Sequence, residues 1–151
     1  MSNKEVCIDL LDDTDPAERR AAADILVASF DDPLRYSPER ILNELTQEPL
    51  PYYRRFLVAR LAGEVVGVGG IKAADWASDT HILYRSAVAE HARGSGIARA
   101  LIMARIAWAM ETFGHGRLLV STARPRRFGR FGFKVVGGYE AAGRRLMLLE
   151  F

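Results

Sequence analysis

The segment from residue 82 to residue 120 constrains the fold most, because three patterns follow one another in it without interruption. A β-rich run at 82–88 leads into the glycine-rich sequence RGSGIA at 93–98. Apolar residues then recur at helical spacing, and Gly114 stands where a C-cap glycine belongs. A short, fully apolar run follows at 118–120. This order predicts a strand, a helix over about 95–113 that opens at the glycines, and a second strand parallel to the first.

The other segments predict a mixed α/β fold with a mostly antiparallel sheet. Alternating apolar residues at 6–10 predict a first strand, and Asp15-Pro16 and Ser37-Pro38 each predict a capped helix start. Two β-rich runs at 56–61 and 65–71 predict a hairpin, in which the glycines of the second run mark a bulge or a close approach of other backbone. Runs at 133–136 and 146–151 predict a last strand pair. The expected order is β-α-α-β-β-β-α-β-α-β-β.

The chain has 151 residues, nearly half of them hydrophobic, which suits a single domain over 1–151 with its own core. Its net charge of +2 is small, and its arginines crowd into 124–130 instead of forming a basic stripe with interleaved aromatics. We therefore expect no nucleic-acid partner. No apolar run approaches the ~20 residues that span a bilayer, and the N-terminal sequence lacks a signal-peptide core. A cytoplasmic protein with no membrane partner is the expectation.

Cysteine usage excludes an intramolecular disulfide, because Cys7 is the single cysteine. Cys7 lies in a hydrophobic alternation, so we expect a small core residue there. No Cys/His cluster has metal-ligand spacing, and no metal is expected.

The glycines of the 93–98 turn favour an anion site. Gly94 and Gly96 let the backbone approach a ligand closely, and the first amides of the following helix carry partial positive charge. Arg93 and Arg99 add charge-assisted contacts. A plain helix start explains the turn equally well when it is taken alone. A dinucleotide-binding fingerprint fits less well, because Arg99 stands where that motif has glycine or alanine, and a P-loop lacks its Gly-Lys-Ser/Thr ending.

Two motifs together resemble the GNAT superfamily of acyl-CoA-dependent N-acyltransferases. Its acetyl-CoA site is written Gln/Arg-x-x-Gly-x-Gly/Ala, which Arg93, Gly96 and Ala98 match. The sequence RFGF at 130–133 resembles the family's Tyr-x-Lys/Arg-x-Gly-Phe strand entry. The predicted element order is similar to that fold over essentially the whole chain.

The resemblance implies a V-shaped opening between the parallel strands, in which the pantetheine of acetyl-CoA pairs with backbone near Val88. The helix N-terminus would hold the diphosphate. The implied cofactor-binding residues are Val88, Arg93, Gly94, Ser95, Gly96, Ile97, Ala98 and Arg99. The implied reaction is direct attack by a primary amine of a small molecule or peptide, and the resemblance leaves a homodimer open.

The family's thiol-protonating tyrosine is replaced here, since the alignment places Phe128 at its position. Either water or Ser121 protonates the thiolate, or the chain binds acyl-CoA as a regulatory module with little turnover.

Several residues remain open for the acceptor end. Tyr84 is a candidate catalytic residue, and the candidate bases are His81, Tyr84, Asp75, Glu140 or a chain of waters. The loop Asp31-Asp32 would attract a cationic amine or simply cap a helix. The arginines of 124–130 would bind CoA phosphate, contact an anionic acceptor or face solvent. Candidate aromatic residues for the acceptor pocket are Trp76, Tyr52 and Tyr53.

Overall fold

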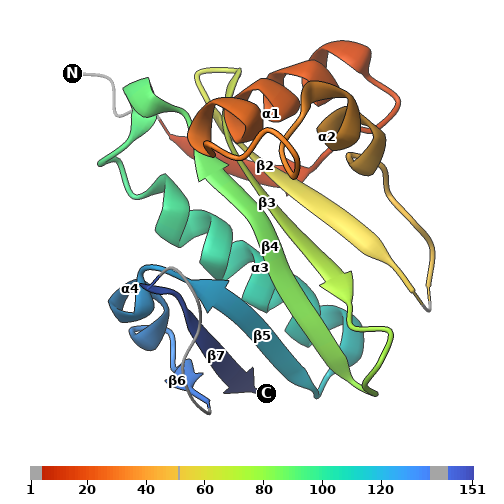
Figure 1. Ribbon diagram of the computed structural model, residues 1–151, viewed down its shortest axis with the longest axis vertical. Coiled ribbons are helices and arrows are strands. Elements are labelled where there is room, and N and C mark those ends of the chain that lie inside the picture. The colour runs from red at the N-terminus through yellow and green to blue at the C-terminus, as the bar shows by residue number, and fades with distance from the viewer. Residues whose placement is uncertain (1–4, 51, 137–142) are drawn as a thin grey trace.

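A computed structural model describes residues 5–50, 52–136 and 143–151 (Figure 1). The helices are α1 (Pro16–Ser29), α2 (Pro38–Glu44), α3 (Ile97–Phe113) and α4 (Pro125–Gly129), with a 3₁₀ turn at Glu90–Ala92. The strands are β1 (Val6–Leu10), β2 (Arg54–Leu61), β3 (Glu64–Ala73), β4 (Thr80–Val88), β5 (Arg117–Thr122), β6 (Lys134–Val135) and β7 (Arg145–Glu150). The element order predicted from the sequence is confirmed.

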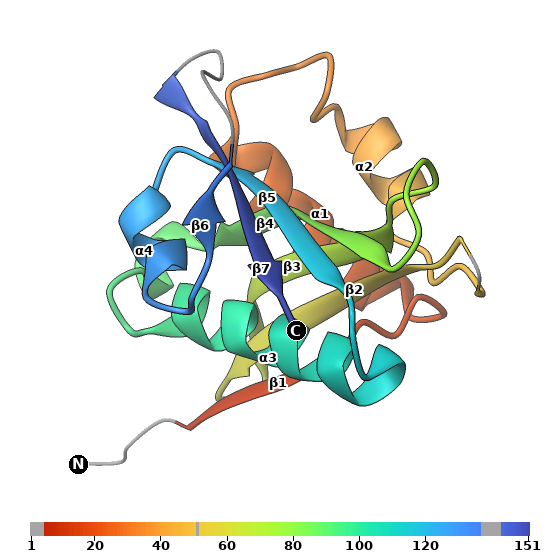
Figure 2. The same cartoon turned by 90° about the horizontal axis from the view of Figure 1, so that it is seen from below.

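One sheet contains these strands in the order β1-β2-β3-β4-β5-β7-β6 (Figure 2). Every neighbouring pair is antiparallel except β4 and β5, which are parallel. The parallel crossover through α3 is therefore confirmed. The mixed fold with a mostly antiparallel sheet is confirmed as well.

The sheet divides where β4 and β5 separate. β4 pairs with β5 only from Thr80 to Leu83, whose partners run from Arg117 to Val120. Beyond that point β4 stays with β3 and β5 stays with β7, so the two halves of the sheet diverge. This is the V-shaped opening that the family resemblance implied.

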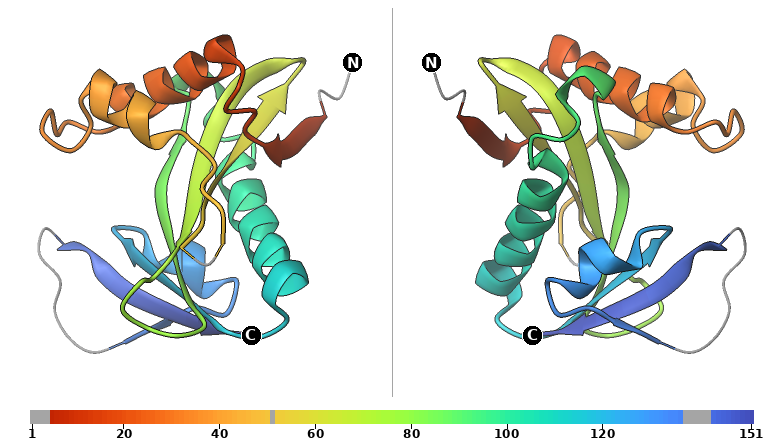
Figure 3. Two further views of the ribbon diagram at one scale, coloured as in Figure 1. Left: turned by 90° about the vertical axis from the view of Figure 1, so that its right-hand side faces the viewer. Right: turned by 90° about the vertical axis from the view of Figure 1, so that its left-hand side faces the viewer.

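Helices cover both faces of the sheet, as Figure 3 shows: α1 and α2 lie on one side of β2–β4 and α3 on the other. The alternation in β2 supplies both cores. Phe56 and Val58 pack under α1 and α2, whereas Leu57 and Ala59 face α3.

Two glycines in β3 allow α3 to lie close to the sheet. A Cβ on Gly67 would lie 3.0 Å from side-chain atoms of both Ile97 and Leu101. A Cβ on Gly69 would lie 2.9 Å from the guanidinium of Arg105. The predicted close approach is thus confirmed, and the predicted bulge also occurs beside these glycines, where the β3–β4 register shifts between Val68 and Gly70.

The expectation for Cys7 is wrong, because its side chain is exposed. Val6 and Ile8 pack partly against the core, and the residue between them on an edge strand points to the opposite face. Both predicted helix caps are correct: Asp15 accepts from the amides of Ala17 and Glu18, and Ser37 accepts from the amide of Arg40.

Candidate functional site

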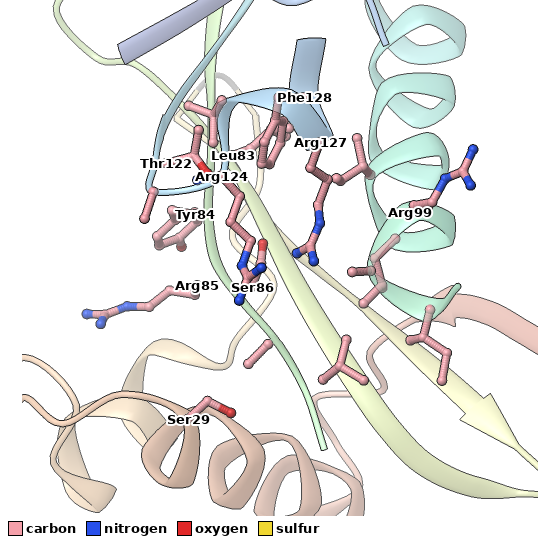
Figure 4. A pocket seen from close by; sticks show the side chains of 18 of the residues that line it. Ser29, Leu83, Tyr84, Arg85, Ser86, Arg99, Thr122, Arg124, Arg127 and Phe128 are labelled. Carbon is pink, nitrogen blue, oxygen red and sulfur yellow. The ribbon is translucent and has the colours of Figure 1, made fainter. Parts of the chain in front are cut away.

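The opening between β4 and β5 leads into a cavity of about 1210 Å³ (Figure 4). Its wall is formed by the end of α1, the second half of β4, the first two turns of α3, the end of β5 and α4. Ligand pockets usually measure ~300–1,000 Å³, so this cavity accommodates a long ligand or two ligands together.

The cavity wall is strongly basic. Nine of its residues are arginines: Arg85, Arg93, Arg99, Arg105, Arg124, Arg126, Arg127, Arg130 and Arg144. Among the lining residues that the structure describes there is no Asp, Glu, His or Lys. The wall therefore favours anionic ligands.

The N-terminus of α3 opens into this cavity without a capping side chain. Gly96 is the N-cap residue, and within the described chain no side chain accepts from the first amides, in contrast to the capped α1 and α2. Gly94 and Gly96 have φ angles of 85° and 79°, and both line the cavity. Ile97, Ala98 and Arg99 also line it, whereas Ser95 is exposed beside it. The free amides form an anion site.

Arg93 connects this turn to neighbouring elements. Its Nε donates to the carbonyl oxygen of Val88 at 3.1 Å, and its Nη2 donates to Oγ of Ser29 at 3.4 Å. The Val88 carbonyl, which the family resemblance assigned to a ligand amide, thus has a side-chain donor. Arg99 is exposed, and in Figure 4 its guanidinium points away from the opening.

A bulge in β4 lies at the point where the strands separate. Tyr84 pairs with Gly70 and Ala87 pairs with Val68, so Arg85 and Ser86 together oppose a single residue of β3. Arg85 has a φ of 50°, a left-handed conformation that costs a non-glycine residue about 1–3 kcal/mol. A bulge leaves backbone groups outside the ladder, here beside the cavity.

The side chain of Arg85 fixes the bulge to α2. Its Nε and Nη2 donate to the two carboxylate oxygens of Glu44, each at 3.1 Å, and its Cζ lies 4.3 Å from the ring centre of Tyr36. The charge of Arg85 is therefore already neutralised, and its role is structural.

Tyr84 lines the cavity with a half-buried ring. The ring packs 5.6 Å from that of Phe56, and the ammonium of Lys72 lies 4.5 Å from its centre. Burial raises the pKa of Tyr84 well above its ordinary value of 10.0. The phenol stays protonated at neutral pH, which suits a proton donor and not a base.

Ser121 and Phe128 lie at the other side of the opening. Arg144 donates to Oγ of Ser121 at 3.2 Å and to its carbonyl oxygen at 2.6 Å. Because the Ser121 hydroxyl accepts from an arginine, its own proton stays available. Phe128 is buried and packs edge to face against Phe133, with ring centres 5.4 Å apart. Both residues line the cavity.

His81 and Asp75, two of the other proposed bases, do not line the cavity. His81 is buried in the core, where Nδ1 lies 2.7 Å from the hydroxyl oxygen of Tyr53 and burial lowers the pKa of the ring. Asp75 is exposed on the β3–β4 connection, and Glu140 lies outside the described residues. The proposed acceptor aromatics also lie elsewhere: Tyr53 is buried with His81, and Tyr52 and Trp76 are exposed away from the cavity.

Sequence reasoning missed Arg105, which is 1% exposed beneath the sheet and lines the cavity. Its Nε donates to the carbonyl of Leu101 at 3.1 Å and its Nη1 to that of Gly70 at 3.0 Å. Burial lowers the pKa of Arg105 to about 10, so it is still a cation at neutral pH. Its position four residues after Leu101, on the buried face of the helix, was the available signal.

Within the described ranges no three His, Cys, Asp or Glu side chains gather where they could hold a metal ion. None of the helices there has the length and apolar character needed to cross a membrane.

The family follows from comparison with known proteins. The model of the acetyltransferase (GNAT) family matches residues 19–133, which is more than half of the chain. The chain belongs to the GNAT family of acetyltransferases. A search of curated proteins gives no match.

Solved structures share the fold at low sequence identity. An aminoglycoside 6'-N-acetyltransferase complexed with coenzyme A superposes with a TM-score of 0.77 at 16% identity, covering 95% of this chain and 96% of that one. Rv2747 from Mycobacterium tuberculosis, also determined with CoA, gives 0.75 at 19% identity over 96% and 99%. A GNAT acetyltransferase from Streptococcus pneumoniae gives 0.73 at 19% identity over 97% and 100%.

Proposed function

We propose that this chain is a single N-acetyltransferase domain over residues 1–151, which transfers an acetyl group from acetyl-CoA to a primary amine of a small molecule or peptide. The observation that carries the proposal is the uncapped start of α3, which opens through two left-handed glycines into the cavity between β4 and β5. The family match and the CoA found in two structural neighbours support the same donor.

The cofactor fits the anion site described above. The diphosphate would accept from the amides of Ile97, Ala98 and Arg99, while Gly94 and Gly96 keep side chains out of its way. The exposed Ser95 would lie beside it. Pantetheine would lie along β4 and pair with backbone near Val88. Since Arg93 occupies that carbonyl, its guanidinium would turn toward the phosphates when the cofactor binds.

The reaction needs an unprotonated amine, a polarised carbonyl and a proton for the leaving thiolate. The amine forms a C–N bond to the acetyl carbon while the C–S bond breaks, and one proton leaves the nitrogen as another reaches the sulfur. Bulge backbone at Arg85 and Ser86 would polarise the thioester carbonyl. Because the described lining offers no carboxylate or imidazole, water would carry the amine proton to solvent.

Two hydroxyls are available as the acid in place of the missing tyrosine. Tyr84 stays protonated at neutral pH, and the Ser121 hydroxyl has its proton free. The alternative function, an acyl-CoA-binding regulatory module with little turnover, is favoured by Phe128, whose ring cannot donate a proton.

A thiol-release assay with acetyl-CoA against a broad amine panel tests the proposal, with CoA binding measured in parallel. We expect saturable binding and thiol release with at least one amine. Saturable binding without thiol release for any amine would establish the regulatory alternative.

The variant Phe128→Tyr tests how the thiolate is protonated. A restored phenol should raise kcat by roughly ten-fold, within the range that a positioned acid contributes. Tyr84→Phe and Ser121→Ala should each lower kcat in the parent chain if that residue is the acid. A kcat that is unchanged in Phe128→Tyr at every pH would mean that another group already protonates the thiolate.

A further inference from the structure

The charge of the cavity wall exceeds what the cofactor alone requires. The diphosphate and the ribose phosphate of CoA carry about four negative charges. Nine arginines line the cavity, and of these Arg85 is neutralised by Glu44. Roughly half of the remaining guanidinium groups would still lack a counter-ion with the cofactor bound.

Two of these arginines belong to the β5 side of the opening and not to the α3 turn. Arg124 follows β5 and lines the cavity, and in Figure 4 its side chain points into the opening. Arg144 precedes β7 and holds Ser121 at the end of β5. Arg127, in contrast, points into the space between α4 and α3, on the side of the diphosphate site.

Arg124 and Arg127 also act on each other as like charges. Burial, and then the charge of Arg124, lower the pKa of Arg127. No salt bridge to either residue, or to Arg144, occurs within the described part of the chain. An anion between these groups would relieve the repulsion.

The facing wall, among the described residues, offers no carboxylate to a cationic acceptor. It consists of Ser29, Phe30 and Tyr36, and the two aromatic rings stack 4.2 Å apart. The acidic loop Asp31-Asp32 does not line the cavity. Asp32 instead accepts from the amide of Arg35 and pairs with its guanidinium at 3.6 Å, so its carboxylate stabilises a local turn.

We infer that the acceptor amine carries an anionic group, a carboxylate or a phosphate, which Arg124 and Arg144 bind at the β5 side of the opening. The inference rests on the proposed transfer reaction and narrows its substrate class. Guanidinium groups bind carboxylates and phosphates alike through paired N–H donors, so the two arginines suit either anion. Matched substrates separate a carboxylate-bearing amine from a phosphate-bearing one.

The experiment compares matched amines in the thiol-release assay. Glycine and L-leucine are each paired with the corresponding amide, and O-phosphoethanolamine is paired with ethanolamine. Rates are divided by the unprotonated fraction of each amine, so that only recognition differs. We expect at least one anionic member to exceed its neutral partner by roughly ten-fold or more in kcat/KM, the scale of a hydrogen-bonded charge pair.

Variants of Arg124 and Arg144 test whether these residues produce the preference for the anionic amine. Arg124→Gln and Arg144→Gln should each remove most of the ratio between the anionic amine and its neutral partner, while the KM for acetyl-CoA stays within about two-fold of the parent value. Arg20→Gln, an exposed arginine on α1 outside the cavity, is the control and should change neither. A raised KM for acetyl-CoA with the amine preference intact would make these arginines cofactor residues and overturn the inference.

Failure of the proposed function is distinguishable from failure of this inference. Thiol release that is equal or faster with every neutral partner overturns only the anionic acceptor. If no amine gives thiol release, the transferase proposal fails, and calorimetric titration of the same amines into CoA-saturated protein decides the inference. Tighter binding of an anionic member supports it, and its absence overturns it.

Discussion

The variant Gly96→Ala separates ligand binding from stability, because the chain contains a matched control. Gly96 has a φ of 79° at the start of α3, and Gly63 has a φ of 80° in the β2–β3 turn. A Cβ on either glycine would meet nothing within 4 Å. Steric overlap is thus absent at both positions, and only the left-handed backbone disfavours alanine.

That backbone cost gives the expected magnitude for both variants. A left-handed conformation costs an L-residue roughly 1–2 kcal/mol relative to glycine. For a domain of this size each kcal/mol lowers Tm by about 2–4 °C. Gly96→Ala and Gly63→Ala should therefore unfold at similar temperatures without ligand, both below the parent protein.

Affinity for CoA should distinguish the two variants. The new Cβ of Gly96→Ala would enter the space where the diphosphate meets the α3 amides, so we expect affinity to fall about ten-fold or more, or about 1.4 kcal/mol. Gly63→Ala should bind CoA as the parent does. Calorimetric titration gives both affinities, and thermal unfolding with and without CoA provides an independent check.

Two results would contradict this reasoning. Undiminished CoA binding by Gly96→Ala would mean that the diphosphate does not lie at the start of α3. A much larger loss of Tm for Gly96→Ala than for Gly63→Ala would mean that the turn contributes to stability in ways beyond its backbone conformation.

Two further predictions concern the core. Gly69→Ala should lower the free energy of unfolding by about 1–3 kcal/mol, since its Cβ would press on the buried guanidinium of Arg105. Gly129→Ala, whose Cβ would lie in open space, is the control and should be close to neutral. Urea titrations measure both free energies, and equal values would contradict the packing argument. His81 has a lowered pKa in the fold, so the unfolded chain binds its proton first and stability should decline as pH falls below about 6.5. His81→Gln should flatten that decline between pH 7.5 and 5.5, and an unchanged slope would assign it to other groups.

Local patterns predicted most of the fold. Caps such as Asp15 and Ser37 act within a few residues, and the glycine turn before α3 is equally local. The opening between β4 and β5 is different: its two walls are far apart in sequence, and only the family resemblance implied it.

The candidate site was predicted in part, for the same physical reason. The turn at Gly94 and Gly96, which lines the cavity, could be predicted because its glycines and the first amides of α3 lie within one short motif. His81 was wrongly considered as a base, because the local sequence around it does not predict its burial against Tyr53. The neutralisation of Arg85 by Glu44 likewise depends on packing between β4 and α2, which no local pattern encodes.

The glycines of β3 have a consequence for engineering. Replacing strand glycines with residues of higher β-propensity is a common route to thermostability. Here a side chain at Gly67 would press on Ile97, the first residue of α3, and displace the helix start from the mouth of the cavity. Substitution at Gly67 should therefore weaken both the packing of α3 and the proposed ligand site, so screening at this strand should measure binding beside melting temperature.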